Sequence, residues 1–228
     1  SVAFMHQQKQ INQQQGDRLG EAIGLINLGY FYLSFGQFST AHEMLTEALD
    51  IARKLEARRV IAYGLLNLGL AEWRLDHPQD AMQTLNRCSG RLEALCDQRG
   101  LASRHFYLGL ALEKAGNTSQ AAEHFQIAQG GFDDLGMTGQ ALEARAGLIR
   151  LALTDGDQQK AAQLTQKIDE FLHEKGCRGF ELPILVFLTC AEVYRFTGAS
   201  EKFQRVIEEG CREIQAQIEQ ISDLDWKE

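Results

Sequence analysis

The sequence predicts an all-α protein in which antiparallel pairs of helices repeat along the chain and stack into a right-handed superhelical α-solenoid. One observation is a leucine that recurs every 40 residues, at Leu28, Leu68, Leu108 and Leu148. A second is an alanine at the same spacing, at Ala41, Ala81, Ala121 and Ala161. A third is a recurring turn residue, at Gly36, Asp76, Gly116, Gly156 and Gly198. Columns that share one register indicate a repeat array, because a single helix pair cannot bury its apolar face alone.

Within each unit the apolar residues are three and four positions apart, which is the spacing of one face of a helix. The expected first and second helices are 17–35 with 38–55, 57–75 with 78–96, 98–115 with 118–135, 137–154 with 158–175, and 180–197 with 200–221. Repeats 1 to 5 then cover 17–55, 57–96, 98–135, 137–175 and 180–221. We interpret residues 1–15 as the second helix of a partial preceding repeat and residues 222–228 as a tail. All of 1–228 is expected to form a single solenoid domain.

The residues between the helices favour a helix end followed by a new start. In repeat 1, Gly36 can adopt the left-handed conformation that ends a helix, and Ser39 can help to open the next one. In repeat 2, Pro78 stands where the first turn of a helix tolerates proline. Repeats 3 and 4 open their second helices with the polar residues Thr118 and Gln158.

A glycine recurs at one register of the first helices, at Gly29, Gly69 and Gly109. Glycine inside a helix costs about 1 kcal/mol relative to alanine, so its recurrence indicates that two helices approach closely. The expected contacts are the small residues of the second helices, Ala41, Ala81 and Ala121. Gly130 and Gly131 fall near the end of a second helix, which we expect them to weaken or bend.

At these positions the sequence resembles a tetratricopeptide repeat (TPR) array. That pattern places Leu-Gly and an aromatic residue in the first helix, then Ala, an aromatic residue or Leu, and Ala in the second. Repeat 1 matches at Leu28, Gly29, Tyr32, Ala41, Leu45 and Ala48. Repeat 2 keeps four positions and departs at Glu72 and Cys88, and repeat 3 keeps Leu108, Gly109, Ala121, Phe125 and Ala128. Repeats 4 and 5 are weaker matches that follow by spacing.

The 40-residue spacing exceeds the usual TPR length of about 34. It resembles the long-helix form of kinesin light chains, spindle-orientation adaptors and bacterial multidomain signalling ATPases and regulators. The segments Gly16–Ala22 and Ala48–Arg53 resemble the bacterial group in particular. The resemblance therefore implies a fragment of a longer bacterial protein.

Composition argues against nucleic-acid-binding, membrane and secreted proteins. The chain has 23 Lys+Arg against 31 Asp+Glu, a net charge of −8, which nucleic acids and anionic membranes repel. The longest apolar run, Ile184 to Leu188, is far shorter than the ~20 residues that span a bilayer. The N-terminus lacks a signal-peptide pattern. The five cysteines are an odd number that fits reduced thiols, so we expect a cytoplasmic protein.

No catalytic or metal-binding pattern stands out. The six histidines never pair at the three- or four-residue spacing that a zinc site on one helix requires. The sequence has neither a phosphate-binding loop nor a nucleophile elbow. Cys88 and Cys190 fall in columns otherwise held by Ala or Leu, and we interpret them as small core residues. We therefore expect no enzyme activity, no metal and no cofactor.

The resemblance implies that the first helices line a concave groove. Its N-terminal half would be apolar and aromatic, and such an exposed strip marks a binding surface. Asn27 and Asn67 occupy the position whose asparagine, in peptide-binding relatives, hydrogen-bonds an extended ligand, because asparagine offers both a donor and an acceptor. The alternative is that these residues touch a neighbouring repeat or are covered by a missing N-terminal one. The predicted partner-binding residues are Ile26, Asn27, Tyr30, Leu33, Tyr63, Leu66, Asn67, Leu70, Trp73, Arg74, Phe106, Leu110, Lys114, Arg150 and Arg195.

The leading hypothesis is a non-catalytic scaffold that binds a peptide, a helix or a partner domain in this groove, as the TPR region of a larger bacterial signalling or regulatory protein. One alternative is a small-ligand sensor domain of a signalling ATPase or transcription activator. Another is a self-association module, with a homo-oligomer formed through the end faces of the array. The expected partner is a protein or peptide, and neither nucleic acid nor membrane is expected.

Overall fold

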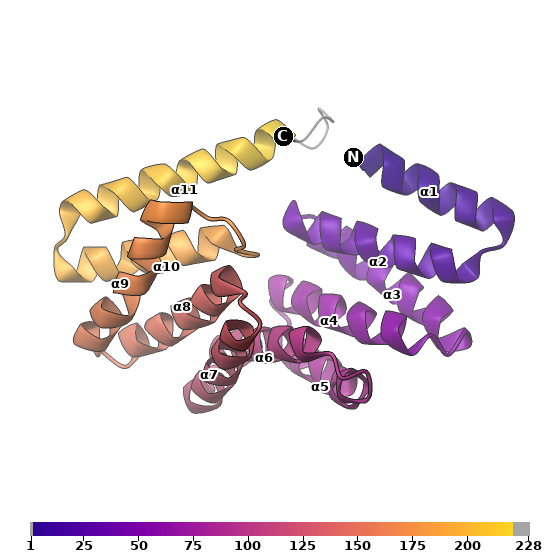
Figure 1. The fold of residues 1–228 in the computed structure, drawn as a ribbon, viewed down its shortest axis with the longest axis horizontal. Helices are drawn as coiled ribbons and strands as arrows, with labels where there is room; N and C mark the ends of the chain where they lie inside the picture. The colour runs from indigo at the N-terminus through magenta and orange to yellow at the C-terminus, as the bar shows by residue number, and fades with distance from the viewer. Residues whose placement is uncertain (1, 221–228) are drawn as a thin grey trace. The chain divides into compact units, whose positions relative to one another are not determined.

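The computed structural model describes residues 2–220, which form eleven α-helices and no β-strand (Figure 1). Contacts between residues group the chain into two compact units, residues 1–131 and 132–228. The first unit contains α1 (Val2–Gln15), α2 (Arg18–Ser34), α3 (Phe38–Lys54), α4 (Arg58–Arg74), α5 (Pro78–Ala94), α6 (Gln98–Lys114) and most of α7 (Thr118–Asp134). The second contains α8 (Thr138–Thr154), α9 (Gln158–Lys175), α10 (Pro183–Thr197) and α11 (Ser200–Gln220).

The predicted all-α fold of packed helix pairs is confirmed. Within the first unit α2 packs on α3 and α4 on α5, and within the second α8 packs on α9 and α10 on α11. The helices begin and end within three residues of the ranges expected from the sequence. The expected tail, 222–228, lies outside the described residues, as does Ile221 at the end of repeat 5. None of the helices in the described range is long and apolar enough to cross a membrane.

One type of link connects the helices from α2 to α9, and each of these links is three residues long. Its middle residue has a positive φ angle, and these residues follow one another every 20 positions: Gly36, Glu56, Asp76, Cys96, Gly116, Gly136 and Gly156. The next amide then donates to a carbonyl five residues earlier, as in Gln37 N–H to Tyr32 O at 3.0 Å. This arrangement satisfies carbonyls at the end of the helix. The predicted turn residues Gly36, Asp76, Gly116 and Gly156 adopt it, whereas Gly198 has the same positive φ but begins the two-residue link between α10 and α11. The three-residue link also joins successive repeats.

The recurrent first-helix glycines pack closely against the second helix of the same pair, as predicted. A Cβ on Gly29 would lie 2.7 Å from Cγ of Leu45, and one on Gly109 would lie 2.6 Å from Cδ1 of Phe125. The predicted contact was one turn away, because Ala41 approaches Gly29 only through its carbonyl oxygen, at 3.4 Å. The glycine column therefore makes room for a large side chain rather than for a second small one.

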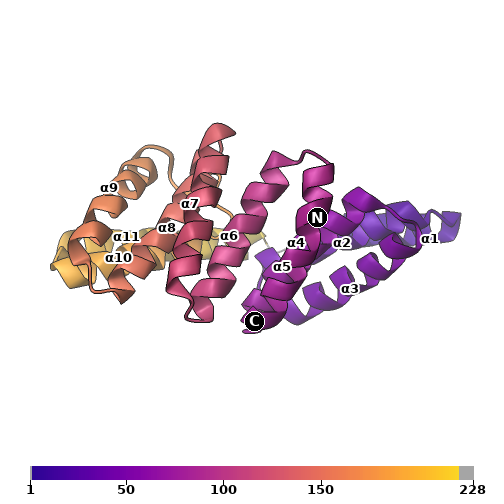
Figure 2. The same ribbon diagram turned by 90° about the horizontal axis from the view of Figure 1, so that it is seen from below.

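Helix α7 continues without a break through Gly130 and Gly131 to Asp134. A Cβ on Gly131 would lie 3.1 Å from Cβ of Ala102 in α6, and Figure 2 shows α6 and α7 side by side. Gly131 thus serves close packing of these two helices, whereas a Cβ on Gly130 would meet nothing within 4 Å.

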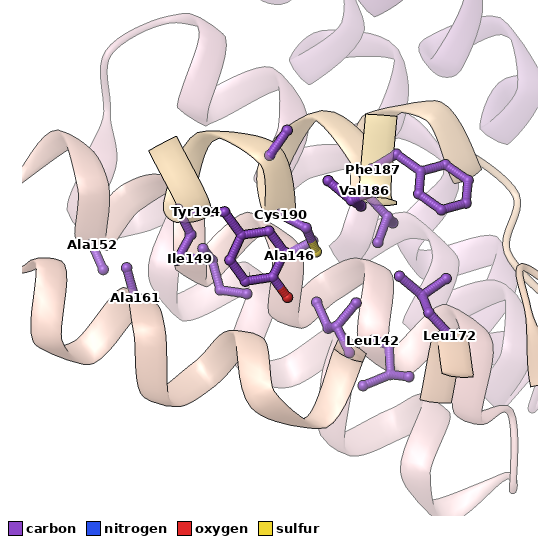
Figure 3. Close-up of a cluster of buried hydrophobic side chains, with 14 residues drawn as sticks. Leu142, Ala146, Ile149, Ala152, Ala161, Leu172, Val186, Phe187, Cys190 and Tyr194 are labelled. Atoms are coloured by element: carbon purple, nitrogen blue, oxygen red, sulfur yellow. The ribbon is translucent and has the colours of Figure 1, made fainter. Parts of the chain in front are cut away.

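The second unit has a core of its own, to which α8, α9, α10 and α11 all contribute (Figure 3). Its buried side chains include Leu142, Ala146, Ile149, Ile168, Leu172, Val186, Phe187, Cys190, Tyr194 and Val206. The link between α9 and α10 is longer than the others, and it lies against the start of α8. A Cβ on Gly139 would be only 2.5 Å from the carbonyl of Gly179, so the two backbones touch.

Candidate functional site

The first helices of the first unit form one continuous face. Helix α2 packs against α4, and α4 packs against α6. These contacts bury part of the predicted groove. Ile26 of α2 illustrates how, since its Cδ1 would be 3.5 Å from a Cβ on Gly64 of α4. Side chains that point between two first helices are therefore used in packing.

Six of the predicted partner-binding residues are buried in this way or against a second helix. They are Ile26, Leu33, Leu66, Leu70, Phe106 and Leu110. Phe106 is only 1% exposed, and its ring centroid is 6.2 Å from that of Phe125. The expectation that these residues form an exposed apolar strip is wrong. The register of a helix gives the direction of a side chain but not the distance to the neighbouring helix, and here that neighbour is close.

The accessible part of the face is more polar than predicted. Asn27 is exposed, Tyr30 is 42% exposed, and Asn67 and Trp73 are half-buried. The amides of Asn27 and Asn67 make no hydrogen bond to any residue in the described part of the chain. They occupy equivalent positions on the adjacent helices α2 and α4, so each can offer a donor and an acceptor to a ligand.

A row of cations and aromatic rings runs along the C-terminal ends of these helices. The guanidinium carbon of Arg74 lies 4.5 Å from the ring centroid of Phe38 and 5.6 Å from that of Trp73. Lys114 Nζ lies 5.8 Å from the Trp73 ring and 3.3 Å from the Trp73 carbonyl oxygen. It also pairs with Asp76 Oδ1 at 2.9 Å and lowers the pKa of that carboxyl group. Lys114 therefore joins α6 to the C-terminal end of α4. The helix dipole makes that end partially negative, so it favours a cation.

Tyr63, another predicted site residue, is half-buried and has a structural contact. Its hydroxyl donates to Oδ2 of Asp97 at 2.7 Å, and Oδ1 of Asp97 accepts the Gly100 amide at the start of α6. Burial raises the pKa of Tyr63, and so does the hydrogen bond to Asp97. The Tyr63 ring still belongs to the α2–α4–α6 face, but its hydroxyl is committed to the next repeat.

The two remaining predicted residues lie in the second unit. Arg150 of α8 is half-buried and donates to the Thr189 hydroxyl of α10 at 3.2 Å. Arg195 of α10 is exposed, 3.7 Å from Glu192 and 5.0 Å from the ring centroid of Phe196. Arg150 thus connects two first helices, and Arg195 is available at the surface.

A buried carboxylate, Glu143 in α8, was not among the predicted site residues. It is 2% exposed, and its Oε1 accepts the backbone amides of Glu181, at 2.8 Å, and of Leu182. Its Oε2 is buried without a hydrogen-bond partner among the described residues. Burial, together with the charge of Glu181, raises the pKa of Glu143 to about 8. Glu143 has the register of Tyr63, two repeats later, and likewise holds the chain that enters the next first helix.

The structure also brings together two histidines that the sequence did not predict to be a pair. Nδ1 of His105 in α6 is 2.8 Å from Nδ1 of His124 in α7. Burial, His124 and Arg104 lower the pKa of His105 to about 4, and burial lowers that of His124. The two histidines lie on different helices, 19 positions apart, so the three- or four-residue spacing of a pair on one helix does not apply to them. Within the described residues, no group of three His, Cys, Asp or Glu side chains could hold a metal ion.

Cys88 and Cys190 are buried core residues, whereas Cys96 and Cys211 are exposed. All five cysteines are free. Burial raises the pKa of Cys88 to about 11 and that of Cys190 to about 12, so both thiols stay protonated and unreactive at neutral pH.

No protein-family model and no curated protein sequence matches this chain. Solved structures do resemble it. A Rap protein in complex with Competence and Sporulation Factor superposes with a TM-score of 0.70 at 14% identity, over 91% of this chain and 62% of the Rap chain. BtubC from P. vanneervenii gives 0.67 at 15% identity, over 97% and 92% of the two chains. Kinesin-light-chain TPR-like repeats from Podosopora anserina give 0.57 at 18% identity, over 86% and 96%.

Proposed function

We propose that this chain, which has the fold of a TPR-type helical repeat protein, is a non-catalytic interaction module that binds an extended segment of a partner protein. The binding surface is the accessible face of α2, α4 and α6 in the first unit. The observation that carries the proposal is the pair Asn27 and Asn67, which stand at equivalent positions on neighbouring helices with amides that bond to no described residue.

The chemistry of this face suits a peptide backbone. Each peptide group offers one N–H donor and one carbonyl acceptor, and an asparagine amide can pair with both. Tyr30, three positions after Asn27, and Trp73, in the last turn of α4, add aromatic surface to these helices, and residues of this type dominate binding energy at protein interfaces. The exposed Arg74 adds a cation at the end of the face, which favours an acidic or carboxylate group in the ligand.

The test begins with peptides selected from a random displayed library on the wild-type chain. Their affinity is then measured by fluorescence anisotropy for wild type and for the double variant Asn27→Ala/Asn67→Ala. The double variant loses at least one hydrogen bond per asparagine, each worth about 0.5–1.5 kcal/mol. Two such losses should weaken binding roughly 5- to 150-fold. The control is Gln83→Ala, an exposed amide on α5, which should bind like wild type. Failure to select any peptide, or equal affinity of the double variant, would refute the proposal.

The same proposal extends to context. We propose a cytoplasmic chain that is the TPR region of a larger bacterial signalling or regulatory protein, with neither nucleic acid nor membrane as a partner. The sequence resemblance of Gly16–Ala22 and Ala48–Arg53 supports the bacterial context, and the net charge of −8 supports the absence of nucleic acid. The upstream and downstream reading frame tests it directly, because an ATPase, cyclase or kinase module should be encoded there.

A second candidate function, small-ligand sensing, is favoured by one feature of the second unit. A pocket of about 370 Å³ lies between α9, α10 and α11, lined by Thr165, Asp169, Tyr194 and Lys202 among others. This volume is in the range of small-molecule sites, although Lys202 and Arg205 both pair with Asp169. A metabolite that raises the melting temperature of wild type but not of Tyr194→Ala would support this candidate.

A further inference from the structure

The link between α9 and α10, residues 176–182, differs from the three-residue links that precede it. It is seven residues long, and its two glycines, Gly176 and Gly179, both have positive φ angles. Both glycines and Arg178 between them are exposed. Exposed segments outside regular structure are the parts of a protein that open most easily, so what fastens this one matters. It is called the α9–α10 strap below.

Two side-chain contacts fasten the strap to α9 and α11. The ring centroid of Phe180 lies 5.5 Å from that of Phe171 in α9. The thiol of Cys177 donates to Oε2 of Glu213 in α11 at 2.9 Å. Cys177 is half-buried in this position, and burial together with Glu213 raises its pKa to about 11. The closed strap therefore keeps this thiol protonated and partly covered.

The contact with α8 is made by a carboxyl group. Oε1 of Glu143 accepts the backbone amides of Glu181, at 2.8 Å, and of Leu182. Oε2 of Glu143 is buried without a hydrogen-bond partner among the described residues. The backbone of Gly179 touches α8 at Gly139 beside this contact. With Glu143 only 2% exposed, the carboxyl group is shielded from water where the strap meets α8.

A carboxyl group in this setting is held in its neutral form. An ionised carboxylate is strongly disfavoured when one of its oxygens is buried and no donor reaches it. The two strap amides favour the ionised form of Glu143, but burial outweighs them and the charge of Glu181 acts in the same direction as burial. The pKa of Glu143 is therefore about 8 while the strap is closed.

The other neighbours of Glu143 bring no compensating cation. The positions one turn before and after it in α8, and the first turn of α10, are uncharged: Gly139, Gln140, Ala146, Gly147, Pro183, Ile184, Leu185 and Val186. The remaining charged or titratable side chains at the end of α9 and in the strap are exposed: His173, Glu174, Lys175 and Arg178. From α11, Glu213 faces Cys177. Ionised Glu143 is thus repelled by its charged neighbour rather than neutralised by one.

We propose that the α9–α10 strap is a pH-sensitive switch, which stays closed on α8 while Glu143 keeps its proton and detaches when this carboxyl group ionises. Detachment lets water reach the carboxylate, including the oxygen that has no partner in the closed form. It also separates Cys177 from Glu213 and Phe180 from Phe171. The open strap therefore presents a thiol that the closed strap covers.

The pH range of the switch follows from the two states of Glu143. In the open strap its pKa is the ordinary value of about 4.3, and in the closed strap it is about 8. Between these values the closed form holds a proton that the open form has released. Opening should therefore become about tenfold more favourable with each pH unit from about pH 5 to pH 8, and should level off above pH 8.

The first test is hydrogen–deuterium exchange of the full chain at a series of pH values, corrected for the intrinsic exchange rate. The Glu181 and Leu182 amides should lose protection about tenfold per pH unit up to about pH 8. The amides of Ile149 and Cys190, in the core of the second unit, should stay at least about tenfold better protected at every pH, because they exchange only when the unit unfolds. Equal protection of strap and core, or strap protection that does not change with pH, overturns the proposal.

Three variants assign the pH dependence to Glu143. Glu143→Gln keeps an oxygen that can accept the two amides but cannot ionise, so its strap protection should not change with pH. Glu174→Gln, at an exposed position near the end of α9, is the matched control and should follow wild type. Persistence of the pH dependence in Glu143→Gln overturns the proposal. Should Glu143→Gln lose helical content, Glu181→Gln decides: without the repelling charge, opening should level off at a lower pH than in wild type, and an unchanged curve overturns the proposal.

A second test follows the thiol itself. The background Cys96→Ser/Cys211→Ser removes the two exposed thiols. The rate at which iodoacetamide labels Cys177 is measured by mass spectrometry and divided by the rate for a model cysteine peptide at the same pH. This ratio should rise from about pH 6 to pH 8 in the background chain and stay constant when Glu143→Gln is added. A constant ratio in both chains, or an equal rise in both, overturns the proposal. None of these outcomes depends on the α2–α4–α6 face.

Discussion

The hydroxyl of Tyr63 in α4 donates a 2.7 Å hydrogen bond to the carboxylate of Asp97, the residue that caps the N-terminus of α6. One carboxylate therefore closes a helix end through Gly100 and connects two successive repeats. In the second unit, the carboxyl group of Glu143, which has the register of Tyr63 two repeats later, accepts the backbone amides of Glu181 and Leu182 just before α10. The first contact thus joins α4 to the start of α6, and the second joins α8 to the chain that enters α10.

Tyr63→Phe should lower the free energy of unfolding by about 1 kcal/mol, because it removes one hydrogen bond to a charged group and keeps the ring. Asp97→Ala should cost about 2 kcal/mol, because it also removes the helix cap. Urea denaturation followed by circular dichroism measures both. In a double-mutant cycle the two changes should couple by about 1 kcal/mol, and additive effects would show that the hydrogen bond contributes nothing.

Stability should fall with rising pH through Glu143. Its pKa in the folded chain is about 8, above the ordinary value, so the folded state keeps a proton that the unfolded state releases. The stabilisation is complete below the unfolded pKa and is lost as the pH rises through 8. Wild type should therefore lose stability relative to Glu143→Gln between about pH 5 and pH 9. Parallel curves in urea denaturation at a series of pH values would contradict this prediction.

His105 and His124 should produce the opposite slope. Their pKa values are lowered in the folded chain, that of His105 to about 4. Their contribution is present above the ordinary histidine pKa of about 6.5 and is lost as the pH falls toward 4. The melting temperature of wild type should drop more steeply between pH 7 and pH 4.5 than that of His105→Phe. The control is His42→Phe, a half-buried histidine outside this pair, and equal slopes for wild type and His105→Phe would count against the pairing.

Two glycines of α2 should respond in opposite directions to alanine. A Cβ on Gly24 would meet nothing within 4 Å, so Gly24→Ala should stabilise the chain by up to about 1 kcal/mol through helix propensity. A Cβ on Gly29 would lie 2.7 Å from Leu45, and overpacking costs about 1–3 kcal/mol. Gly29→Ala should therefore destabilise by about 1 kcal/mol net in thermal or urea unfolding. Stabilisation by both variants would show that Leu45 moves aside freely.

The repeat fold could be predicted because its information is local and recurs. Leu28, Gly29 and Ala41 return at a constant spacing, and turn residues such as Gly36 mark the helix ends, so type and bounds of the helices follow from the sequence. The exposure of the groove did not follow, because it depends on the distance between neighbouring helices. Phe106 has the right register for a groove residue, yet it is buried against Phe125.

Side-chain contacts between different helices could not be predicted from the sequence either. His105 and His124 are 19 positions apart, and nothing in either helix alone predicts that their rings meet. Glu143 has the register of Tyr63, but the two use different chemistry, one as an acceptor of backbone amides and the other as a hydroxyl donor. A comparison of the same register across repeats, with attention to polar residues, is the signal that could have found Glu143.

The links with a left-handed residue at every twentieth position also bear on how such a chain can grow. The link within a helix pair and the link between pairs have the same geometry. A gene segment that encodes two helices can therefore be duplicated or deleted in frame, and the new connection is again a link of this type. The longer link between α9 and α10 interrupts the 20-residue spacing, and it lies between repeats 4 and 5, which match the repeat pattern least. Related chains that have more or fewer helix pairs before Gly176 should therefore differ in length there by multiples of the 40-residue repeat.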